Sequence, residues 1–393
     1  MENTLEFNSK EVKGHSQDWS KQISSFYKSI DVDSDIYNCL ENLPRYVRVV
    51  GFDYTIINGF PHNYNDNPSK RLKSESSQKI ERGTNTLEMN FSKDTKYLEN
   101  IAKQLQAQIH CKVSLSPTIL GILRISDGKA KINNTDLYKT GKIIGIDLSS
   151  VITAMSLEVH PNDHVLDLCC APGGKLLLIA DSLQKNGPPS KKSFGTITGV
   201  DISQKRISIC QSLIKKSNSM AKIRVRLFAT DGTTFKVPPP DENWWDFNHL
   251  KKNPPSKPNG LQEPKISKTE SSVLKPFFSS KLLRNISTPN SLANKKYSKV
   301  LVDAECSHDG SLIHLEKYIN TSSGSFAKLD DEFLTYDRLK NVSDLQYKLI
   351  LNGWNNLCVD GTLIYSTCSL SYKQNELVIA KFMEKIIMDH NSE

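Results

Sequence analysis

Short apolar runs alternate with longer amphipathic stretches over the second half of the chain. Apolar runs bounded by turn residues are typical of buried strands, and apolar positions three and four residues apart indicate helices. The predicted strands lie at 165–168, 196–201, 222–228, 299–303 and 361–367. The predicted helices lie at 151–159, where Ser149 is the cap, and at 176–183, 205–216, 341–358 and 375–387. This alternation predicts an α/β fold with a doubly wound, mainly parallel sheet.

The N-terminal part has fewer apolar runs, and polar segments separate them. Its predicted elements are helices at 18–30 and 94–105, a strand at 43–50 and a strand-rich stretch at 112–125. In the strand that follows Pro44, the side chains of Tyr46, Arg48 and Val50 share one face. We therefore predict a smaller α+β domain over residues 1–140 and a second domain over residues 141–393.

Two segments lack apolar periodicity and are interpreted as insertions. Residues 61–85 are rich in Asn, Ser and Lys, which predicts disorder. Residues 236–297 hold nine of the seventeen prolines, and eleven Lys and Arg against five Asp and Glu. We expect the fold to survive deletion of residues 240–295.

A glycine turn connects the strand at 165–168 to the helix that follows it. Its residues are Cys169, Cys170, Ala171, Pro172, Gly173, Gly174 and Lys175. Glycines allow a ligand close to the backbone, and a helix start presents free amide hydrogens. The turn does not match G-x-G-x-x-G, nor a phosphate loop, because Leu176 follows the lysine. It indicates an adenosine-type cofactor site, with a purely structural turn as the alternative.

Acids and thiols follow the other predicted strands. They are Asp201, Asp231, Asp303, Cys306 and Cys368. Ligands of such sheets bind at the carboxyl ends of the strands, so these side chains are expected to converge. An acid after the second strand accepts hydrogen bonds from ribose hydroxyls, while Asp231 either meets an adenine or makes a turn.

The two thiols after the last strands suggest a particular chemistry. Carbon 5 of a pyrimidine is a poor nucleophile until a thiolate adds to carbon 6, after which it can attack an electrophilic methyl group. A carboxyl group beside the ring assists as electron density moves. Cys39, Cys111, Cys210 and Cys358 are interpreted as core residues. No C-x-x-C pair is present, so no metal site is predicted.

Composition restricts the partners and the compartment. The 393 residues carry a net charge of +8, which permits a polyanionic partner. No secretory signal or membrane-length apolar run is present, which favours a reducing compartment. We predict an intracellular monomer without membrane contact, in the nucleus or nucleolus or in the cytoplasm.

Five motifs occur in an order that resembles the Nop/Sun (RsmB-like) family of RNA cytosine-5 methyltransferases. They are VLDLCCAPGGK at 165–175, VDISQKR at 200–206, TDGT at 230–233, LVDAECS at 301–307 and YSTCS at 365–369. Gln346, Asn375, Glu376 and the strand motif PRYVR at 44–48 also match. The resemblance implies a Rossmann-like class I methyltransferase domain.

The resemblance also implies a role for each matching residue. The turn from Cys169 to Lys175 would hold S-adenosylmethionine, with Asp201 at its ribose, Asp231 at its adenine and Arg206 shaping the pocket. Asp303 would lie near the target base, Cys368 would be the nucleophile and Cys306 would help to release the product. Arg45 and Arg48 would contact phosphates of the RNA, which is a tRNA or an rRNA.

The chain departs from the family pattern in three places. Glu305 stands where the family has proline, and it is expected to raise the pKa of Cys306. His308 stands in a loop where small residues are more common. The chain ends at Glu393, where the family generally continues into further strands, so either the sheet is shortened or the sequence is incomplete.

Three other functions are alternatives to an active RNA methyltransferase. A non-catalytic RNA-binding factor for ribosome assembly on the same scaffold is the main alternative, although it would need neither thiol. Methylation of an adenine amino group is rejected, because the stretch NPPS at 253–256 lacks the aromatic residue and lies in the insertion. A DNA target would use a thiol at the position of Cys306, whereas Cys368 favours RNA.

Overall fold

The structure, a computed structural model, describes 43–52, 54–56, 84–185, 195–217, 224–240, 274–281, 283, 295–311 and 336–390. The predicted helix at 18–30 and residues 241–273 lie outside these ranges, as does the predicted insertion at 61–85 except for Thr84 and Asn85, which begin a helix. None of the described helices combines the length and the apolar character that crossing a membrane requires.

The second domain is built on a six-stranded sheet with the order β10-β9-β8-β7-β11-β12. The strands are β7 (His164–Asp167), β8 (Thr196–Asp201), β9 (Val225–Ala229), β10 (Phe278–Ser279), β11 (Tyr297–Asp303) and β12 (Leu357–Ser366). All neighbours pair in parallel except β10, which is antiparallel to β9. The predicted α/β fold with a mainly parallel sheet is therefore confirmed, and the strand order reverses between β7 and β11.

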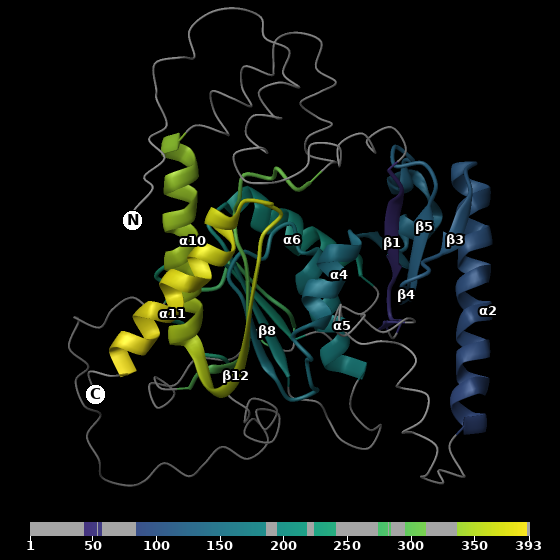
Figure 1. Ribbon diagram of the computed structural model, residues 1–393. Coiled ribbons are helices and arrows are strands. Elements are labelled where there is room, and N and C mark those ends of the chain that lie inside the picture. The colour runs from purple at the N-terminus through teal and green to yellow at the C-terminus, as the bar shows by residue number, and fades with distance from the viewer. Residues whose placement is uncertain are drawn as a thin grey trace, which may run out of the picture.

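Helices cover both faces of this sheet, as Figure 1 shows. On one side lie α4 (Leu148–Met155), α5 (Gly174–Lys185) and α6 (Gln204–Lys216), and on the other lie α10 (Tyr336–Asn356) and α11 (Glu376–His390). Side chains alternate between the two cores: Val165 packs with α5 and α6, whereas Leu166 packs with Leu349 of α10. A 3-10 turn, Tyr372–Gln374, precedes α11. Burial on both faces explains why these strands read as continuous apolar runs.

The N-terminal unit is an antiparallel sheet covered by one long helix. Its strand order is β3-β5-β1-β6, beside a two-stranded β2-β4 ribbon. The elements are β1 (Arg45–Val49), β2 (Thr55–Ile56), α2 (Thr84–Ile109), β3 (Val113–Leu115), β4 (Ile119–Leu120), β5 (Ile122–Ile125), a 3-10 turn (Ile132–Asn134), α3 (Asp136–Lys139) and β6 (Ile143–Gly145). Leu98 and Leu105 of α2 pack against Val47 of β1. Because β6 pairs with β1, this sheet continues past the predicted boundary at residue 140.

Two predicted details of the second domain are wrong. The supposed insertion at 236–297 contains β10, whose Phe278 is only 6% exposed and pairs with Leu227 of β9. It also contains Tyr297, which is buried at the start of β11. Deleting 240–295 would therefore remove core residues. Ser149 is not the cap of α4, because the helix begins at Leu148 after Asp147.

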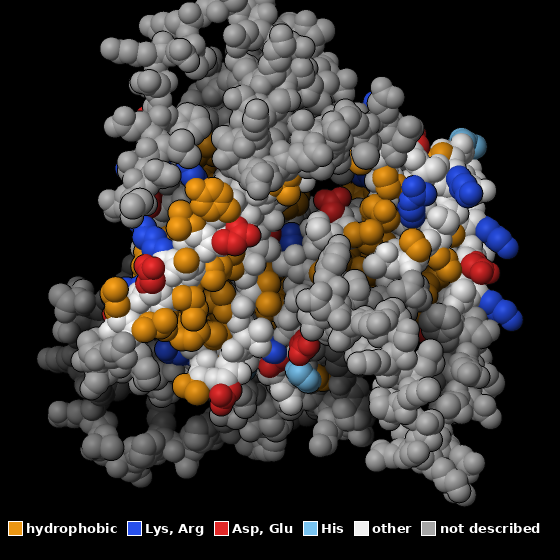
Figure 2. Space-filling model, viewed as in Figure 1, with side chains coloured by type: hydrophobic (Ala, Val, Ile, Leu, Met, Phe, Trp, Pro, Cys, Tyr) orange, Lys and Arg blue, Asp and Glu red, His pale blue; other side chains and the backbone are white. Residues whose placement is uncertain are grey.

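Apolar side chains are exposed on α11 and on β12. Leu377, Met383 and Ile387 of α11 and Val359 of β12 are among the exposed large hydrophobic residues. Figure 2 shows hydrophobic side chains gathered over this side of the molecule. The side of the sheet that ends in β12 is therefore less polar than an ordinary solvated surface.

Arg48 joins the N-terminal sheet to the second domain. Its guanidinium is 0% exposed, and Nη1 donates to Asp181 Oδ2 of α5 at 2.6 Å and to the Tyr54 hydroxyl at 3.0 Å. Tyr46 and Val50, on the same face of β1, pack against the core of the second domain. The shared face was predicted correctly, but it is an internal contact. The expectation that Arg48 binds RNA phosphates is therefore wrong, because no phosphate reaches a fully buried side chain.

Substitution Arg48→Met should lower the free energy of unfolding by about 3–5 kcal/mol, because it leaves the Asp181 carboxylate buried without its partner. The double variant Arg48→Met/Asp181→Leu should recover most of this loss. Urea unfolding followed by circular dichroism measures both. A double variant as unstable as the single one would show that the long arginine side chain stabilises by packing and not by charge.

Candidate active site

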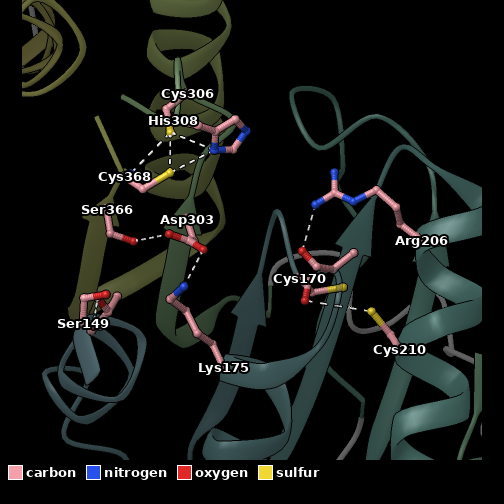
Figure 3. Close-up of polar contacts among 12 residues, drawn as sticks. Ser149, Cys170, Lys175, Arg206, Cys210, Asp303, Cys306, His308, Ser366 and Cys368 are labelled. Carbon is pink, nitrogen blue, oxygen red and sulfur yellow. Dashed lines mark hydrogen bonds and ion pairs between the residues drawn. The ribbon is translucent and has the colours of Figure 1, made fainter. Parts of the chain in front are cut away.

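Acids and thiols gather at the carboxyl ends of the parallel strands, where the strand order reverses. Asp167 ends β7, Asp201 ends β8 and Asp303 ends β11. The loops after β11 and β12 bring Cys306 and Cys368 to the same edge, as Figure 3 shows. This is the position at which open α/β sheets bind their ligands.

The glycine turn leaves room for a ligand at the start of α5. Gly173 has a φ of +102°, and a Cβ there would lie 3.3 Å from the Cys210 sulfur. A Cβ on Gly174 would meet nothing within 4 Å, so this residue borders open space. Cys170 and Cys210 are buried side by side, and burial raises the pKa of the Cys170 thiol. Both thiols thus serve packing and not reactivity.

Asp201 and Arg206 tie the end of β8 to the glycine turn. The Asp201 carboxylate is buried and accepts a hydrogen bond from the Ser203 amide at 2.9 Å. Arg206 lies 3.4 Å from the same carboxylate and donates to the Ala171 carbonyl at 2.8 Å. Asp231, by contrast, is exposed, and its Oδ1 accepts two hydrogen bonds from Thr233. These hydrogen bonds stabilise a turn, which was one of the two predicted roles of Asp231.

Lys175 reaches from the turn across to β11. Its Nζ donates to Asp303 Oδ2 at 2.7 Å, and the Ser366 hydroxyl of β12 donates to Asp303 Oδ1 at 2.7 Å. Both oxygens of the Asp303 carboxylate are therefore held, as the dashed lines in Figure 3 show. These contacts link two strands, β11 and β12, to the glycine turn at one point of the sheet edge.

Asp167 is a site residue that the sequence analysis did not single out. It is 1% exposed, and its Oδ1 has no hydrogen-bond partner among the described residues. Burial, with the nearby Asp303 carboxylate second, raises the pKa of Asp167 to about 8. A buried, unpartnered carboxyl oxygen beside an open glycine turn is suited to a cationic or hydrogen-bond-donating ligand. The available signal was an acid inside the apolar run VLDL.

Cys306, His308 and Cys368 form what we call the thiol–imidazole cluster. The two Sγ atoms are 3.0 Å apart, and His308 Nδ1 lies 3.0 Å from the Cys368 sulfur and 3.7 Å from the Cys306 sulfur. The Cys368 amide also donates to the Cys306 sulfur at 3.3 Å. His308 has a φ of +58°, a left-handed conformation that non-glycine residues rarely adopt. The sequence placed the two cysteines in one site, but it gave no role to His308.

The two thiols of the cluster share one negative charge. Hydrogen bonding from Cys368, aided by His308, lowers the pKa of Cys306 to about 5, although burial acts in the opposite direction. The same hydrogen bond, together with burial, raises the pKa of Cys368. The contact with the Cys306 sulfur raises the pKa of His308. A thiolate at neutral pH is therefore shared by the pair.

Glu305 does not act on Cys306 as predicted. Its carboxylate contacts the Arg338 guanidinium at 3.2 Å, and its carbonyl accepts from the Gln346 amide at 2.8 Å. The pKa of Cys306 moves down, opposite to the expected direction. The reason is that Arg338 offsets the glutamate charge, while hydrogen bonds reach the Cys306 sulfur directly.

A buried polar network fixes the loops that carry the two thiols. The Ser307 hydroxyl bonds to the Asp309 carboxylate and lies 3.0 Å from the Ser369 hydroxyl, and it accepts from the Gln374 amide at 2.7 Å. Asp309 Oδ2 in turn accepts from the Leu370 amide at 2.9 Å. Each of these bonds crosses between, or braces, the loops after β11 and β12. The sulfur-to-sulfur distance is thus set by a network and not by the cysteines alone.

Arg45, the other predicted RNA contact, lies at the start of β1. Its guanidinium donates to the Ala130 carbonyl at 2.8 Å, and the residue is partly exposed. Because the residue is partly exposed, its contact with RNA stays a prediction.

Comparison with known proteins identifies relatives of this chain. Residues 282–391 match the family described as 16S rRNA methyltransferase RsmB/F. The chain is 24% identical over 266 residues to the tRNA (cytosine(34)-C(5))-methyltransferase of Drosophila melanogaster, covering 67% of this chain and 27% of that protein. It is 22% identical over 304 residues to the 5-cytosine rRNA methyltransferase NSUN4 of Xenopus laevis, covering 74% of this chain and 55% of that protein.

The fold is also similar to a solved structure. The crystal structure of PH0851 aligns with a TM-score of 0.54 and 18% identity, over 95% of this chain and 60% of that one. At this identity the likeness bears on the fold alone. The chain spans between about a quarter and about half of the length of the two curated relatives above.

As the pH rises from about 5 to about 8, the free energy of unfolding of the wild-type protein should fall relative to that of the variant Asp167→Asn. In this window the buried carboxyl, whose pKa is about 8, keeps a proton that the unfolded chain has released. The folded state therefore binds more protons, and its stability falls by at most about 1.4 kcal/mol per pH unit.

Urea unfolding at a series of pH values, without added ligand, measures this difference. The variant Asp94→Asn, at an exposed position of α2, is the control and should follow the wild type. Parallel profiles for the wild type and Asp167→Asn would show that burial does not hold the proton on Asp167.

Proposed function

This chain belongs to the Nop/Sun (RsmB-like) family, and from that premise we propose that it methylates carbon 5 of cytosine in RNA, with S-adenosylmethionine as the methyl donor. The observation that carries the proposal is the pair of sulfurs of Cys306 and Cys368, 3.0 Å apart beside the acids at the strand ends. A methyl transfer to an already nucleophilic atom would need neither thiol. Addition to carbon 6 and later release of the product use both.

The residues at the glycine turn fit the methyl donor. Gly174 borders open space, Asp201 is a buried acid at the position that meets ribose hydroxyls, and Asp167 offers an unpartnered carboxyl oxygen. When bound there, S-adenosylmethionine would supply an electrophilic methyl group on a positively charged sulfur. Asp201 and Asp303 favour such a positive charge, and the charge in turn would favour loss of the proton from Asp167, whose pKa is about 8.

The thiol pair can start the reaction by an internal proton transfer. The Cys368 proton passes to the Cys306 thiolate across 3.0 Å, which leaves a thiolate on Cys368 and a neutral thiol on Cys306. The Cys368 thiolate would then bond to carbon 6 of the cytosine, and the electron pair moved to carbon 5 would take the methyl group, while the electrons of the broken methyl–sulfur bond stay with the donor as a neutral thioether. The role of Asp303, held by Lys175 and Ser366, is to face the ring during this step.

Release of the product breaks the bond between Cys368 and carbon 6. A base takes the proton from carbon 5, the electron pair reforms the ring double bond, and the bond between Cys368 and carbon 6 breaks. Cys306 is suited to this role after its own proton has passed to solvent, because hydrogen bonds from the Cys368 amide and from His308 stabilise its thiolate. In the net reaction, carbon 5 of the cytosine gains one methyl group and loses one proton.

The N-terminal unit is proposed to position the RNA, with Arg45 at its surface. The relatives are named for tRNA and for rRNA, so either class is a candidate substrate. We further propose that the protein works inside the cell as a monomer. A non-catalytic RNA-binding role is the alternative, and the first experiment below separates the two.

The variant Cys368→Ala should lose methyl transfer, because the sulfur assigned to carbon 6 is removed and Cys306 is left with the role of release, but it should still bind S-adenosylmethionine. Transfer of labelled methyl to total cellular RNA, with nucleoside analysis for 5-methylcytosine, measures the activity. Cys111→Ala, a thiol of the N-terminal unit, is the matched control and should keep its activity. Turnover by Cys368→Ala would refute the assignment of the nucleophile. No transfer by the wild type, with the methyl donor bound, would favour the non-catalytic role.

The variant Cys306→Ala should accumulate a covalent adduct between Cys368 and the RNA, because release loses its base while addition remains. A denaturing gel with labelled RNA detects the adduct as a slower protein band. The double variant Cys306→Ala/Cys368→Ala should show none. Full turnover without adduct in Cys306→Ala would assign release to another group.

A further inference from the structure

We propose that the thiol–imidazole cluster of Cys306, His308 and Cys368 is a zinc-binding site, so that zinc and the target base compete for the same thiols. The binding itself is independent of the proposed function. The inhibition that follows from it rests on that function. Spacing along the chain predicted no metal, and the fold brings together ligands that lie 2 and 62 residues away from Cys306.

The chemistry of the three side chains fits zinc. Two thiolates and one imidazole form a ligand set that proteins use for a zinc ion with an open fourth position. In this cluster the three ligand atoms all lie within 4.8 Å of one another. Thiolate ligands also discriminate against magnesium and calcium, which bind oxygen. The fourth position would be filled by water.

The distances allow one ion to reach all three atoms. The triangle with sides of 3.0, 3.0 and 3.7 Å has a circumscribed radius of about 1.9 Å, shorter than the Zn–N distance of about 2.0–2.1 Å and the Zn–S distance of about 2.3 Å. An ion just above the plane of the three atoms therefore contacts each of them. Ideal tetrahedral angles require the sulfurs to separate to about 3.8 Å, a movement of less than 1 Å.

The surroundings hold the ligands in place before any metal arrives. The network of Ser307, Asp309, Ser369 and Gln374 fixes both cysteine loops, as described above. The left-handed backbone at His308 turns the imidazole back toward the sulfurs. In Figure 3 the ring and both thiols point toward one another. Little reorganisation is needed, which favours binding.

Binding and catalysis exclude each other in this arrangement. Zinc takes the lone pairs of both sulfurs and releases the remaining thiol proton to solvent, so Cys368 is no longer free to add to carbon 6. No electrons are transferred, and removal of the metal restores the thiols. The site thus provides reversible inhibition that depends on the free zinc concentration.

Cobalt(II) titration of the metal-free, reduced protein tests the site without RNA or methyl donor. We expect one equivalent to give the visible absorption and the thiolate charge-transfer band of a tetrahedral cobalt site, and zinc to displace it. Cys306→Ser and Cys368→Ser should each remove most of the thiolate band. Cys111→Ser is the control and should behave as the wild type.

His308→Asn keeps the experiment decisive if a cysteine variant does not fold. It retains both thiols, and loss of a direct ligand should weaken cobalt binding about 10-fold or more. Thermal melting confirms that the variant is folded. A cobalt site unchanged in both His308→Asn and Cys306→Ser, or no thiolate band in the wild type, would overturn the proposal.

A second measurement addresses inhibition. Zinc should abolish methyl transfer to RNA by the wild type, and a chelator should restore it. Wild-type protein that binds cobalt but never methylates RNA would contradict the proposed function and leave the metal site standing. Active protein that shows no cobalt band and no zinc inhibition would contradict the metal site and leave the proposed function standing.

Discussion

Parallel pairing of β11 with β12 is the constraint on which the site depends. The register places Asp303 opposite Ser366, so the loops that follow both strands leave the sheet at the same level. Cys306 lies three residues past Asp303 and Cys368 two residues past Ser366, and the buried network of Ser307 with Ser369 then closes the two loops on each other. A slip of one residue in this pairing would turn the side chains to the opposite face and separate the sulfurs.

The edge of the sheet concentrates carboxyl groups around a small number of cations. Asp167, Asp201 and Asp303 lie on three neighbouring strands, and Lys175 and Arg206 are the cations that contact two of them. The shared thiolate adds a further negative charge. Such a site favours ligands that bring positive charge, because they lower the free energy of burying the carboxylates. A sulfonium methyl donor and a divalent metal ion both satisfy this condition.

The sequence predicted this arrangement where local pattern and chemistry agree. The strand at 196–201 has its predicted bounds, and acids after apolar runs identified the strand ends correctly. Features that depend on partners far along the chain were missed. Phe278 pairs with β9 from within a proline- and lysine-rich segment, and His308 approaches a cysteine 60 residues away. Arg48 looked like a surface cation because its partner, Asp181, lies 133 residues further on. Burial of a charged residue cannot be read from its own neighbours in sequence.

The contact between the two units is made on the helix that also begins the cofactor site. Asp181, which holds Arg48, lies on α5, and α5 starts at Gly174 of the glycine turn, one residue before Lys175. A rigid helix therefore connects the buried ion pair at the N-terminal sheet to the Lys175–Asp303 contact at the sheet edge. Packing of Tyr46 and Val50 against the same core leaves the N-terminal unit little freedom to rotate about this contact. RNA held by that unit would consequently meet the thiols in a fixed orientation, which fast addition to carbon 6 requires.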